Sequence, residues 1–305
     1  MKRYPQCIMA TCCVPWDEQG QFMEEVFRRG VGNTLRDGTR HLYVFGTAGE
    51  GYAVTDEQFF AIVTAFVDEM RSGNAEPMVG VIHLSLGTIL ERIERCREMG
   101  VRDYQISLPS WGALSEREVF TFFQEVCGRF RDCRFLHYNL PRTKRLVTPE
   151  EYARLAEEHP NLVATKNSSD SFSTTARLLE QAPQLQHFLS ETGFAYGSQF
   201  SECGLLASLV TGWSELRRLL RAGIEKDAAT LTQVTRDVRI YFEQLRFLMD
   251  PPLIDGAYDK MFARIHDPEF PLRLLPPYES VGEEEFKRFE AALREKLPHW
   301  MPPLR

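Results

Sequence analysis

Lys166 is the residue whose type and position best fit covalent chemistry. It directly follows the short apolar run 162–165 (LVAT), and it is the only one of seven lysines that ends such a run. If the run is a buried strand, the amine lies in a partly dry pocket, where desolvation lowers its pKa. A neutral amine can attack a ketone and form a Schiff base. A lysine that extends from a strand end into solvent is the structural alternative, and position alone does not decide between the two.

Tyr138 could supply the proton transfers that such chemistry needs. It ends the apolar run 134–138 (RFLHY), which is the run before the one that ends in Lys166. If the two runs are neighbouring strands, the phenol and the amine lie side by side, and a phenol can pass a proton to and from a reacting oxygen. A tyrosine at a strand end can also serve packing and a single hydrogen bond.

A glycine-rich turn, 46–51 (GTAGEG), follows the apolar run 41–45 (HLYVF). Gly46 and Gly49 would allow the backbone to approach a ligand closely. Successive N–H groups in such a turn can hold a carboxylate, and the Thr47 hydroxyl could contact the phenol. A glycine-rich loop without a ligand is the alternative, so this turn gains meaning only together with the lysine and the tyrosine.

Short apolar runs alternate along the chain with longer amphipathic segments, a pattern typical of a parallel sheet with helical crossovers. The eight runs are 7–11, 41–45, 77–82, 103–108, 134–138, 162–166, 187–190 and 205–210. Eight strands close a (β/α)8 barrel, and the first run lacks the GxGxxG turn of an open dinucleotide-binding sheet. We therefore predict an α/β fold, a (β/α)8 TIM barrel over residues 1–226, with a C-terminal helical extension over 227–305 packed on the barrel.

Helices are predicted between these runs, at 55–70, 88–99, 115–130, 148–158 and 171–181, with the first beginning at about residue 21. Thr55 and Gln58 have the spacing of a capping box. In a barrel of this kind catalytic residues sit at the C-terminal ends of the strands, which is where Thr47, Tyr138 and Lys166 would lie.

Composition excludes several other classes of protein. The chain has 305 residues and a net charge of −7, with its basic residues scattered, so it shows no footprint for nucleic acid. No apolar run approaches the ~20 residues of a membrane helix. The seven cysteines lack CxxC spacing, which favours reduced thiols and a cytoplasmic location. The basic and then apolar start is interrupted at Thr11, so a first buried strand is predicted there in preference to a signal peptide.

Three motifs in order resemble the dihydrodipicolinate synthase / N-acetylneuraminate lyase family of class I, Schiff-base aldolases. They are Gly46–Glu50 (GTAGE), Tyr138–Pro141 (YNLP) and the strand-ending Lys166. Segments 251–254 (PPLI) and 272–277 (LRLLPP) also look like the family's C-terminal helical region. The resemblance therefore covers nearly the whole chain.

The resemblance implies a lyase, either an aldolase or a dehydratase, that acts on pyruvate or a related 2-oxo acid. Lys166 would form the imine, Tyr138 would move protons, and Thr47 would orient the phenol. The backbone of Gly46, Thr47 and Ala48 would bind the substrate carboxylate. No metal or organic cofactor is implied, and the expected assembly is a homo-oligomer, a dimer or tetramer. His41, His83 and His137 have no metal-ligand spacing and are interpreted as core residues.

Departures from the family pattern point to a divergent member. Ala48 replaces a hydroxyl residue, and Asn167 stands where the family often has Glu. Trp111 lies near the position where the synthases of the family have a tyrosine. In those proteins this tyrosine comes from a partner subunit and joins the relay of hydroxyl groups that includes the strand-ending tyrosine. Arg142 could bind a second substrate carboxylate, although the stretch around it is one residue short.

Two further segments differ from the standard synthases and lyases. Residues 190–193 (SETG) replace the acidic stretch with which the lyases bind sugar hydroxyls. Trp111, Phe194 and Tyr196 could line an apolar pocket or pack at the barrel rim. Glu50 is expected to bond backbone near the turn, without a catalytic role.

Two functions remain open from the sequence. The first is an imine-forming lyase. The second is a catalytically reduced family member that binds a 2-oxo acid or regulates another process, a reading motivated by Ala48 and Trp111. A metal-dependent barrel enzyme is disfavoured because no convergent His/Asp/Glu set ends the strands. The second substrate, and the choice between cleavage, condensation and dehydration, are not specified by the residues.

Overall fold

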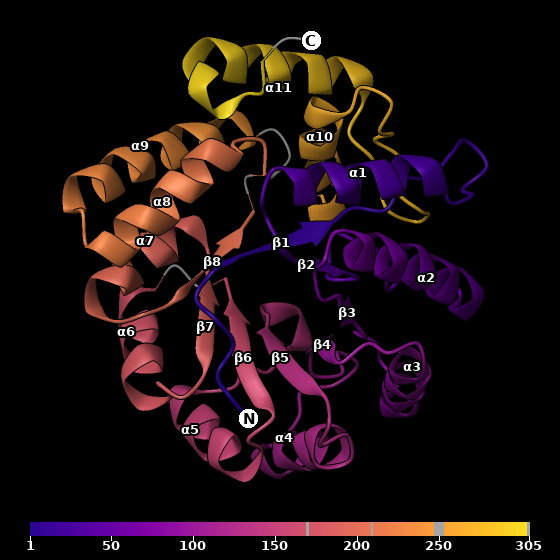
Figure 1. Cartoon of the computed structure of the whole chain (residues 1–305), viewed down its shortest axis with the longest axis vertical. Coiled ribbons are helices and arrows are strands. Elements are labelled where there is room, and N and C mark those ends of the chain that lie inside the picture. The colour runs from indigo at the N-terminus through magenta and orange to yellow at the C-terminus, as the bar shows by residue number, and fades with distance from the viewer. Residues whose placement is uncertain (169–170, 209, 247–252, 304–305) are drawn as a thin grey trace.

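The computed structural model describes residues 1–168, 171–208, 210–246 and 253–303 and has a closed barrel at its centre. Eight parallel strands pair in chain order, and β8 returns to β1 (Figure 1). They are β1 Ile8–Cys12, β2 His41–Val44, β3 Met78–Gly80, β4 Asp103–Ile106, β5 Arg134–Asn139, β6 Leu162–Asn167, β7 Gln186–Leu189 and β8 Gly204–Ala207. The predicted (β/α)8 barrel is confirmed, with each strand within a few residues of its apolar run.

Alternation along the strands divides the buried side chains into two cores, because successive residues of a strand point to opposite faces. On β1, Ile8 and Ala10 pack with the helices, whereas Met9 belongs to a second cluster. On β2, Tyr43 belongs to that same cluster while its neighbours pack outward. The second cluster fills the barrel interior, so Tyr43 lies beneath the mouth.

Eight helices cover the outside of the barrel. They are α1 Glu24–Arg36, α2 Asp56–Ser72, α3 Leu86–Glu98, α4 Glu116–Phe123, α5 Pro149–Glu158, α6 Phe172–Gln181, α7 Glu191–Phe200 and α8 Trp213–Glu225. The predicted capping box is confirmed at α2, where the Gln58 N–H donates to Thr55 Oγ1 at 3.2 Å and Gln58 Oε1 accepts from the Thr55 N–H at 3.0 Å. The predicted helix 115–130 differs, because its second half, 124–128, is a π-helical turn.

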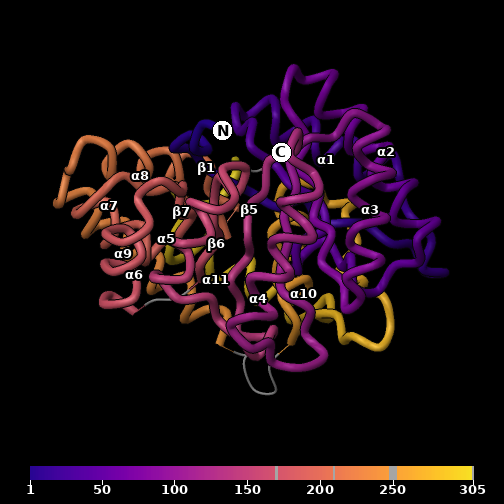
Figure 2. The backbone as a smooth tube through the Cα atoms, turned by 90° about the horizontal axis from the view of Figure 1, so that it is seen from below, coloured from indigo at the N-terminus to yellow at the C-terminus, as the bar shows by residue number. Residues whose placement is uncertain are grey.

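The C-terminal extension contributes α9 Ala228–Gln244, α10 Asp255–His266 and α11 Glu283–Lys296. Figure 1 places α10 and α11 above the barrel and α9 beside α8, and in Figure 2, seen from below, α10 and α11 lie behind the strands. The extension is thus present as predicted. The proposed boundary at 226/227 stays a prediction, and residues 251–252 of the PPLI segment lie outside the described residues.

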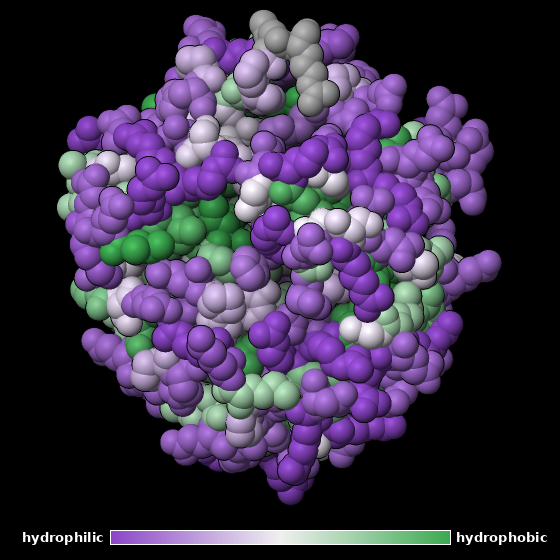
Figure 3. Space-filling model, viewed as in Figure 1, coloured by the Kyte–Doolittle hydropathy of each residue, from purple (hydrophilic) through white to green (hydrophobic). Residues whose placement is uncertain are grey.

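The surface is mostly hydrophilic, with a green apolar band at the left of Figure 3, where Figure 1 places α7 and α8. Exposed large apolar side chains on these two helices include Tyr196, Phe200 and Ile224. Among the described residues, no helix has the length and apolar character needed to cross a bilayer.

Candidate active site

Lys166 lies near the C-terminal end of β6 with its amine in a cavity of about 370 Å³. The side chain is buried, and its Nζ donates a hydrogen bond to the Tyr43 hydroxyl at 2.8 Å. Burial lowers the pKa of Lys166 from 10.5 to about 8, while the carboxyl groups of Asp255 and Asp259 oppose that decrease. The structure therefore excludes the alternative in which the Lys166 side chain extends into solvent. The amine is positioned and partly neutral, as a nucleophile must be.

Tyr138 pairs with Lys166 in the register of β5 and β6, so the sequence argument for their proximity is supported by the geometry. The Lys166 Nζ lies 3.7 Å from the centroid of the Tyr138 ring. Burial raises the pKa of the Tyr138 phenol to about 12, and a polar contact with the Thr47 side chain opposes the increase. The phenol therefore remains protonated at neutral pH and can donate a proton.

The turn 46–51 places Thr47 and Ala48 on the cavity wall, where both are largely buried. Among the described residues, nothing accepts a hydrogen bond from the backbone N–H of Thr47 or Ala48. Gly46 does not line the cavity. Its missing side chain makes room for the Tyr43 ring, which a Cβ would meet at 2.5 Å. The structural requirement at Gly46 is thus packing of a tyrosine, which differs from the predicted approach of a ligand.

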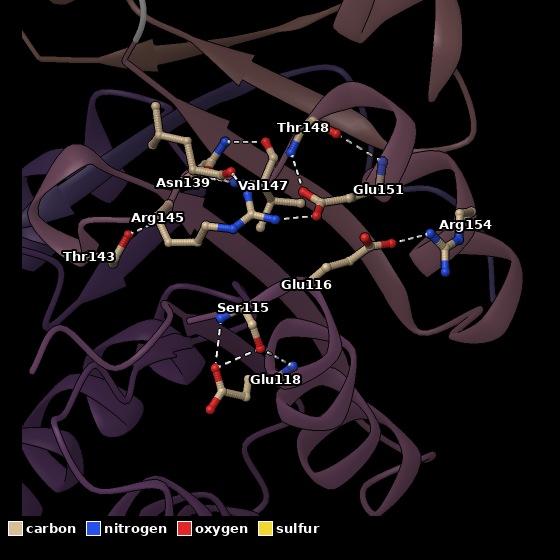
Figure 4. A network of polar contacts seen from close by, with 11 residues as sticks. Ser115, Glu116, Glu118, Asn139, Thr143, Arg145, Val147, Thr148, Glu151 and Arg154 are labelled. Atoms are coloured by element: carbon tan, nitrogen blue, oxygen red, sulfur yellow. Dashed lines mark hydrogen bonds and ion pairs between the residues drawn. The ribbon is translucent and has the colours of Figure 1, made fainter. Parts of the chain in front are cut away.

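The loop after β5 is held by Asn139, the second residue of the YNLP motif. Its side chain accepts a hydrogen bond from the Val147 N–H at 2.9 Å and donates to the Val147 carbonyl at 3.0 Å (Figure 4). Further along, Arg145 pairs with Glu151, whose carboxylate also accepts the Thr148 N–H at 2.8 Å. These bonds fix the residues in between, of which Leu140, Pro141 and Arg142 line the cavity.

Helix α10 supplies cavity residues that the sequence argument missed. Asp255, Tyr258 and Asp259 line the cavity on one helix face, at the spacing i, i+3 and i+4. Burial raises the pKa of the Asp259 carboxyl well above its usual value, which favours its protonated form. Their spacing on a predicted helix was the available signal, but nothing in the sequence connects that helix to the barrel mouth.

The predicted role of Arg142 in binding a second substrate carboxylate stays a prediction, and the structure shows that Arg142 pairs with a carboxylate of the chain itself. Its Nη1 and Nη2 donate to the two carboxylate oxygens of Asp255 at 2.9 and 2.7 Å. Burial acting alone would raise the pKa of Asp255, but the bonds and charge of Arg142 lower it to about 2. Arg142 thus lines the cavity, and two of its N–H groups are already engaged by the Asp255 carboxylate.

Trp111 does not line this cavity, although it was expected to contact substrate. It is 83% exposed on the loop after β4, and its carbonyl accepts a hydrogen bond from Lys144 at 3.0 Å. Phe194 is fully buried among the helices, and Tyr196 is 39% exposed away from the cavity lining. The apolar pocket suggested for these three residues is therefore not formed within the chain.

Among the described residues, no histidine or cysteine joins the two carboxylates, Asp255 and Asp259, that line the cavity. His137 contacts the Tyr152 hydroxyl at 2.6 Å and His41 contacts the Tyr4 hydroxyl at 3.1 Å, both away from the cavity lining. The described residues contain one group of three potential ligands, Glu215, Asp237 and His299, none of which lines the cavity. Asp237 there already accepts a hydrogen bond from His299 at 2.8 Å.

The fold and the site together define a class of protein, the (β/α)8 barrels that hold a buried lysine between two tyrosines at the C-terminal mouth. Within that class, the chain belongs to the dihydrodipicolinate synthetase family, whose model matches residues 5–192. This confirms the resemblance drawn from the three motifs.

Individual relatives are distant in sequence. A 4-hydroxy-tetrahydrodipicolinate synthase from Thermosynechococcus vestitus is 24% identical over 276 residues, which are 87% of this chain and 90% of the relative. The synthase from an Exiguobacterium species is 25% identical over 178 residues, 58% of this chain, and that match spans only 60% of the relative's length.

Solved structures share the fold over nearly the whole chain. An N-acetylneuraminate lyase from Proteus mirabilis superposes with a TM-score of 0.82 at 14% identity, covering 96% of this chain and 99% of the other. YagE from Escherichia coli K12, described in complex with pyruvate, gives 0.79 at 15% identity, with 96% and 98% covered. A monomeric dihydrodipicolinate synthase variant gives 0.82 at 18% identity, with 95% and 96% covered.

Proposed function

We propose that this protein is a Schiff-base-forming lyase, an aldolase or dehydratase, that acts on pyruvate or a related 2-oxo acid through an imine on Lys166. The observation that carries the proposal is the buried amine, whose pKa is lowered to about 8 and whose position is set by the Tyr43 hydroxyl. Family membership supports the same chemistry.

In the proposed reaction the neutral Lys166 amine attacks the ketone carbon and forms a carbinolamine. Proton transfer to its hydroxyl, assigned to Tyr138, allows water to leave and generates the protonated imine. In cleavage, the C4 hydroxyl loses its proton, the C3–C4 bond breaks to release an aldehyde, and the enamine left on Lys166 is protonated at C3 to give the imine again. In dehydration, the imine takes up the electron pair of a C3–H bond as that proton leaves, and hydroxide then departs from C4 and is protonated to water. Hydrolysis returns the 2-oxo acid and the free amine, so no cofactor is consumed.

The substrate carboxylate is assigned to the turn 46–51. Its support is the pair of buried N–H groups at Thr47 and Ala48, for which the described part of the chain provides no acceptor. Ala48 contributes no hydroxyl to this site, so affinity for the carboxylate would rest on the backbone and on Thr47.

The test is intact mass after incubation with pyruvate and borohydride. We expect one reduced pyruvate adduct on the wild-type protein and none on Lys166→Ala. Lys144→Ala, which removes an exposed-loop lysine near the mouth, should retain the adduct. A folded wild-type protein that stays unmodified, or an adduct that persists in Lys166→Ala, would contradict the proposal.

The alternative is a catalytically reduced member that binds or senses a 2-oxo acid. Two observations favour it, namely Ala48 in place of a hydroxyl residue and the pairing of Arg142 with Asp255. Imine trapping without turnover across a panel of aldol and dehydration substrates would support this reading. Cleavage of any one substrate at a rate that depends on Lys166 would exclude it.

We further propose a cytoplasmic homo-oligomer. None of the seven cysteines, all of which lie in the described part of the chain, is in a disulfide, as suits a reducing compartment. Phe172, Tyr196 and Phe200 expose a cluster of aromatic rings on α6 and α7, with centroids 5.3 and 6.4 Å apart. Exposed apolar clusters of this kind often mark protein interfaces.

A further inference from the structure

The ion pair between Arg142 and Asp255 closes one side of the cavity mouth. Arg142 comes from the loop after β5, and Asp255 is the first residue of α10, so the pair joins the barrel to the extension. Two parallel hydrogen bonds of 2.7 and 2.9 Å make it a bidentate pair, the geometry in which arginine binds carboxylates best. The guanidinium is therefore already engaged as it would be by a substrate carboxylate.

Both members of the pair stay charged across the physiological range. The hydrogen bonds to Asp255 raise the pKa of Arg142, and Arg142 lowers that of Asp255 to about 2. A second substrate carboxylate could take the same two donors of Arg142 only by displacing Asp255, and at the remaining N–H groups it would lie beside the Asp255 carboxylate. Two like charges brought together in this way oppose binding.

The rest of the cavity offers no substitute for Arg142. Among the described lining residues, the other cationic side chain is Lys166, which the imine would consume. Asp259, whose protonated form is favoured by burial, adds no positive charge. The rest of the lining is uncharged, with apolar side chains at Leu140, Pro141, Leu206 and Ala207 and hydroxyl groups at Thr11, Ser168, Ser208 and Tyr258.

We propose that the cavity selects 2-oxo acids whose far end is uncharged, and correspondingly an uncharged aldehyde as the second reactant. Asp255 is a specificity-determining residue that acts by occupying Arg142. This inference rests on the proposed function, because it takes the 2-oxo acid end as bound at Lys166. It differs from the proposed function in concerning only the far end of the substrate.

The test compares two acids of equal chain length, 2-oxohexanoate and 2-oxoadipate, which differ in a terminal methyl or carboxylate group. Binding is measured by calorimetry, and imine formation by borohydride trapping. We expect the wild-type protein to bind 2-oxohexanoate at least ~10-fold more tightly than 2-oxoadipate. Equal binding, or preference for 2-oxoadipate, would overturn the inference without the use of any variant.

Asp255→Asn tests the assigned cause. It removes the charge that occupies Arg142 and should improve 2-oxoadipate binding by ~10-fold, with little change for 2-oxohexanoate. Asp132→Asn is the matched control, because Asp132 also accepts a hydrogen bond from an arginine, Arg97, at 2.8 Å but lies on the surface. An unchanged ratio in Asp255→Asn, or the same change in Asp132→Asn, would contradict the role of Asp255.

The two proposals can fail separately. If pyruvate is trapped on Lys166 and the two longer acids bind equally, the chemistry stands and the selectivity is wrong. If the two acids are discriminated in binding but no acid is trapped, the imine mechanism fails and the selectivity stands. If neither longer acid binds, the selectivity is also wrong, because the cavity then does not accept this class of molecule.

Discussion

At the scale of single residues, the environment of Lys166 determines what the site can do. The amine has an aromatic ring beneath it and a phenol oxygen as its acceptor, with no carboxylate within ion-pair distance among the described residues. Because the dominant influence is burial, the pKa falls to about 8 instead of rising as it would beside an anion. The consequence can be measured as a pH dependence.

We expect the rate of imine formation with pyruvate to rise about 10-fold per pH unit below pH 8 and to level off above it, because only the neutral amine attacks. Timed incubations at different pH, each quenched with borohydride at one fixed pH, give this rate. A midpoint near 10.5, the ordinary lysine value, would show that Lys166 is not desolvated. The lowered pKa of Lys166 also makes folding stability depend on pH. Between pH 8 and 10.5 the unfolded chain binds more protons, so the contribution of Lys166 to folding stability increases with pH.

The residue types that carry the proposed chemistry were predictable, and their partners were not. Lys166 and Tyr138 could be placed together because they end successive strands of a parallel sheet. Tyr43 was hidden inside an apolar run, and its contact with Lys166 spans 123 residues of sequence. Asp255 meets Arg142 across 113 residues, a contact that no local pattern encodes.

At the scale of elements, the turn 46–51 and helix α10 are tied together by a buried ion pair. Lys260 and Glu50 are both fully buried, with Nζ and Oε1 2.5 Å apart. The Glu50 carboxylate also accepts hydrogen bonds from Trp16 Nε1 at 2.9 Å and from the Leu275 N–H at 2.8 Å. The expectation that Glu50 bonds backbone was right, but the backbone is that of the extension.

Lys260→Met should destabilise the protein by about 3–5 kcal/mol, because it leaves the Glu50 carboxylate buried without its cation. Urea unfolding followed by circular dichroism measures the change. Lys287→Met is the control, since Lys287 pairs with Glu284 at 2.7 Å on the surface of α11, where water screens the pair, and its loss should leave the unfolding midpoint nearly unchanged. Adding Glu50→Gln to Lys260→Met should recover part of the loss. Equal effects of the two lysine substitutions would contradict this account.

The elements themselves were largely predictable, since strand alternation and caps are local. The capping boxes before α2, α4 and α5 follow from hydroxyl and carboxyl or amide residues three apart. The segment Glu283–Lys296 carries charge pairs three and four residues apart, as a solvated helix does. It also buries Phe286, Phe289 and Leu293, because the extension packs on one of its faces. Docking of α10 against the mouth depends on the complete barrel and could not be derived from local sequence.

At the scale of the whole molecule, the open question is assembly. We expect sedimentation velocity to give a dimer or tetramer of the 35.2 kDa chain. Phe200→Ser, which removes a ring that is 55% exposed, should weaken association if the aromatic cluster on α6 and α7 forms the contact. Phe242→Ser, at an exposed position on α9, is the control. A wild-type protein that sediments as a monomer would make the prediction wrong, and a monomeric dihydrodipicolinate synthase variant shows that this outcome is compatible with the fold.

Helix α10 follows the barrel in sequence yet forms one wall of its mouth. Under the two proposals, the residues for the reaction therefore lie in the barrel strands, and a residue for substrate selectivity lies in the extension. Mutational drift in Asp255 or Tyr258 could redirect the protein to a new metabolite while Lys166 and Tyr138 remain untouched. Exchanging this one helix between relatives is accordingly a route to altered selectivity. The transferred helix must keep Lys260, and the recipient barrel must have a glutamate at the position of Glu50 to pair with it.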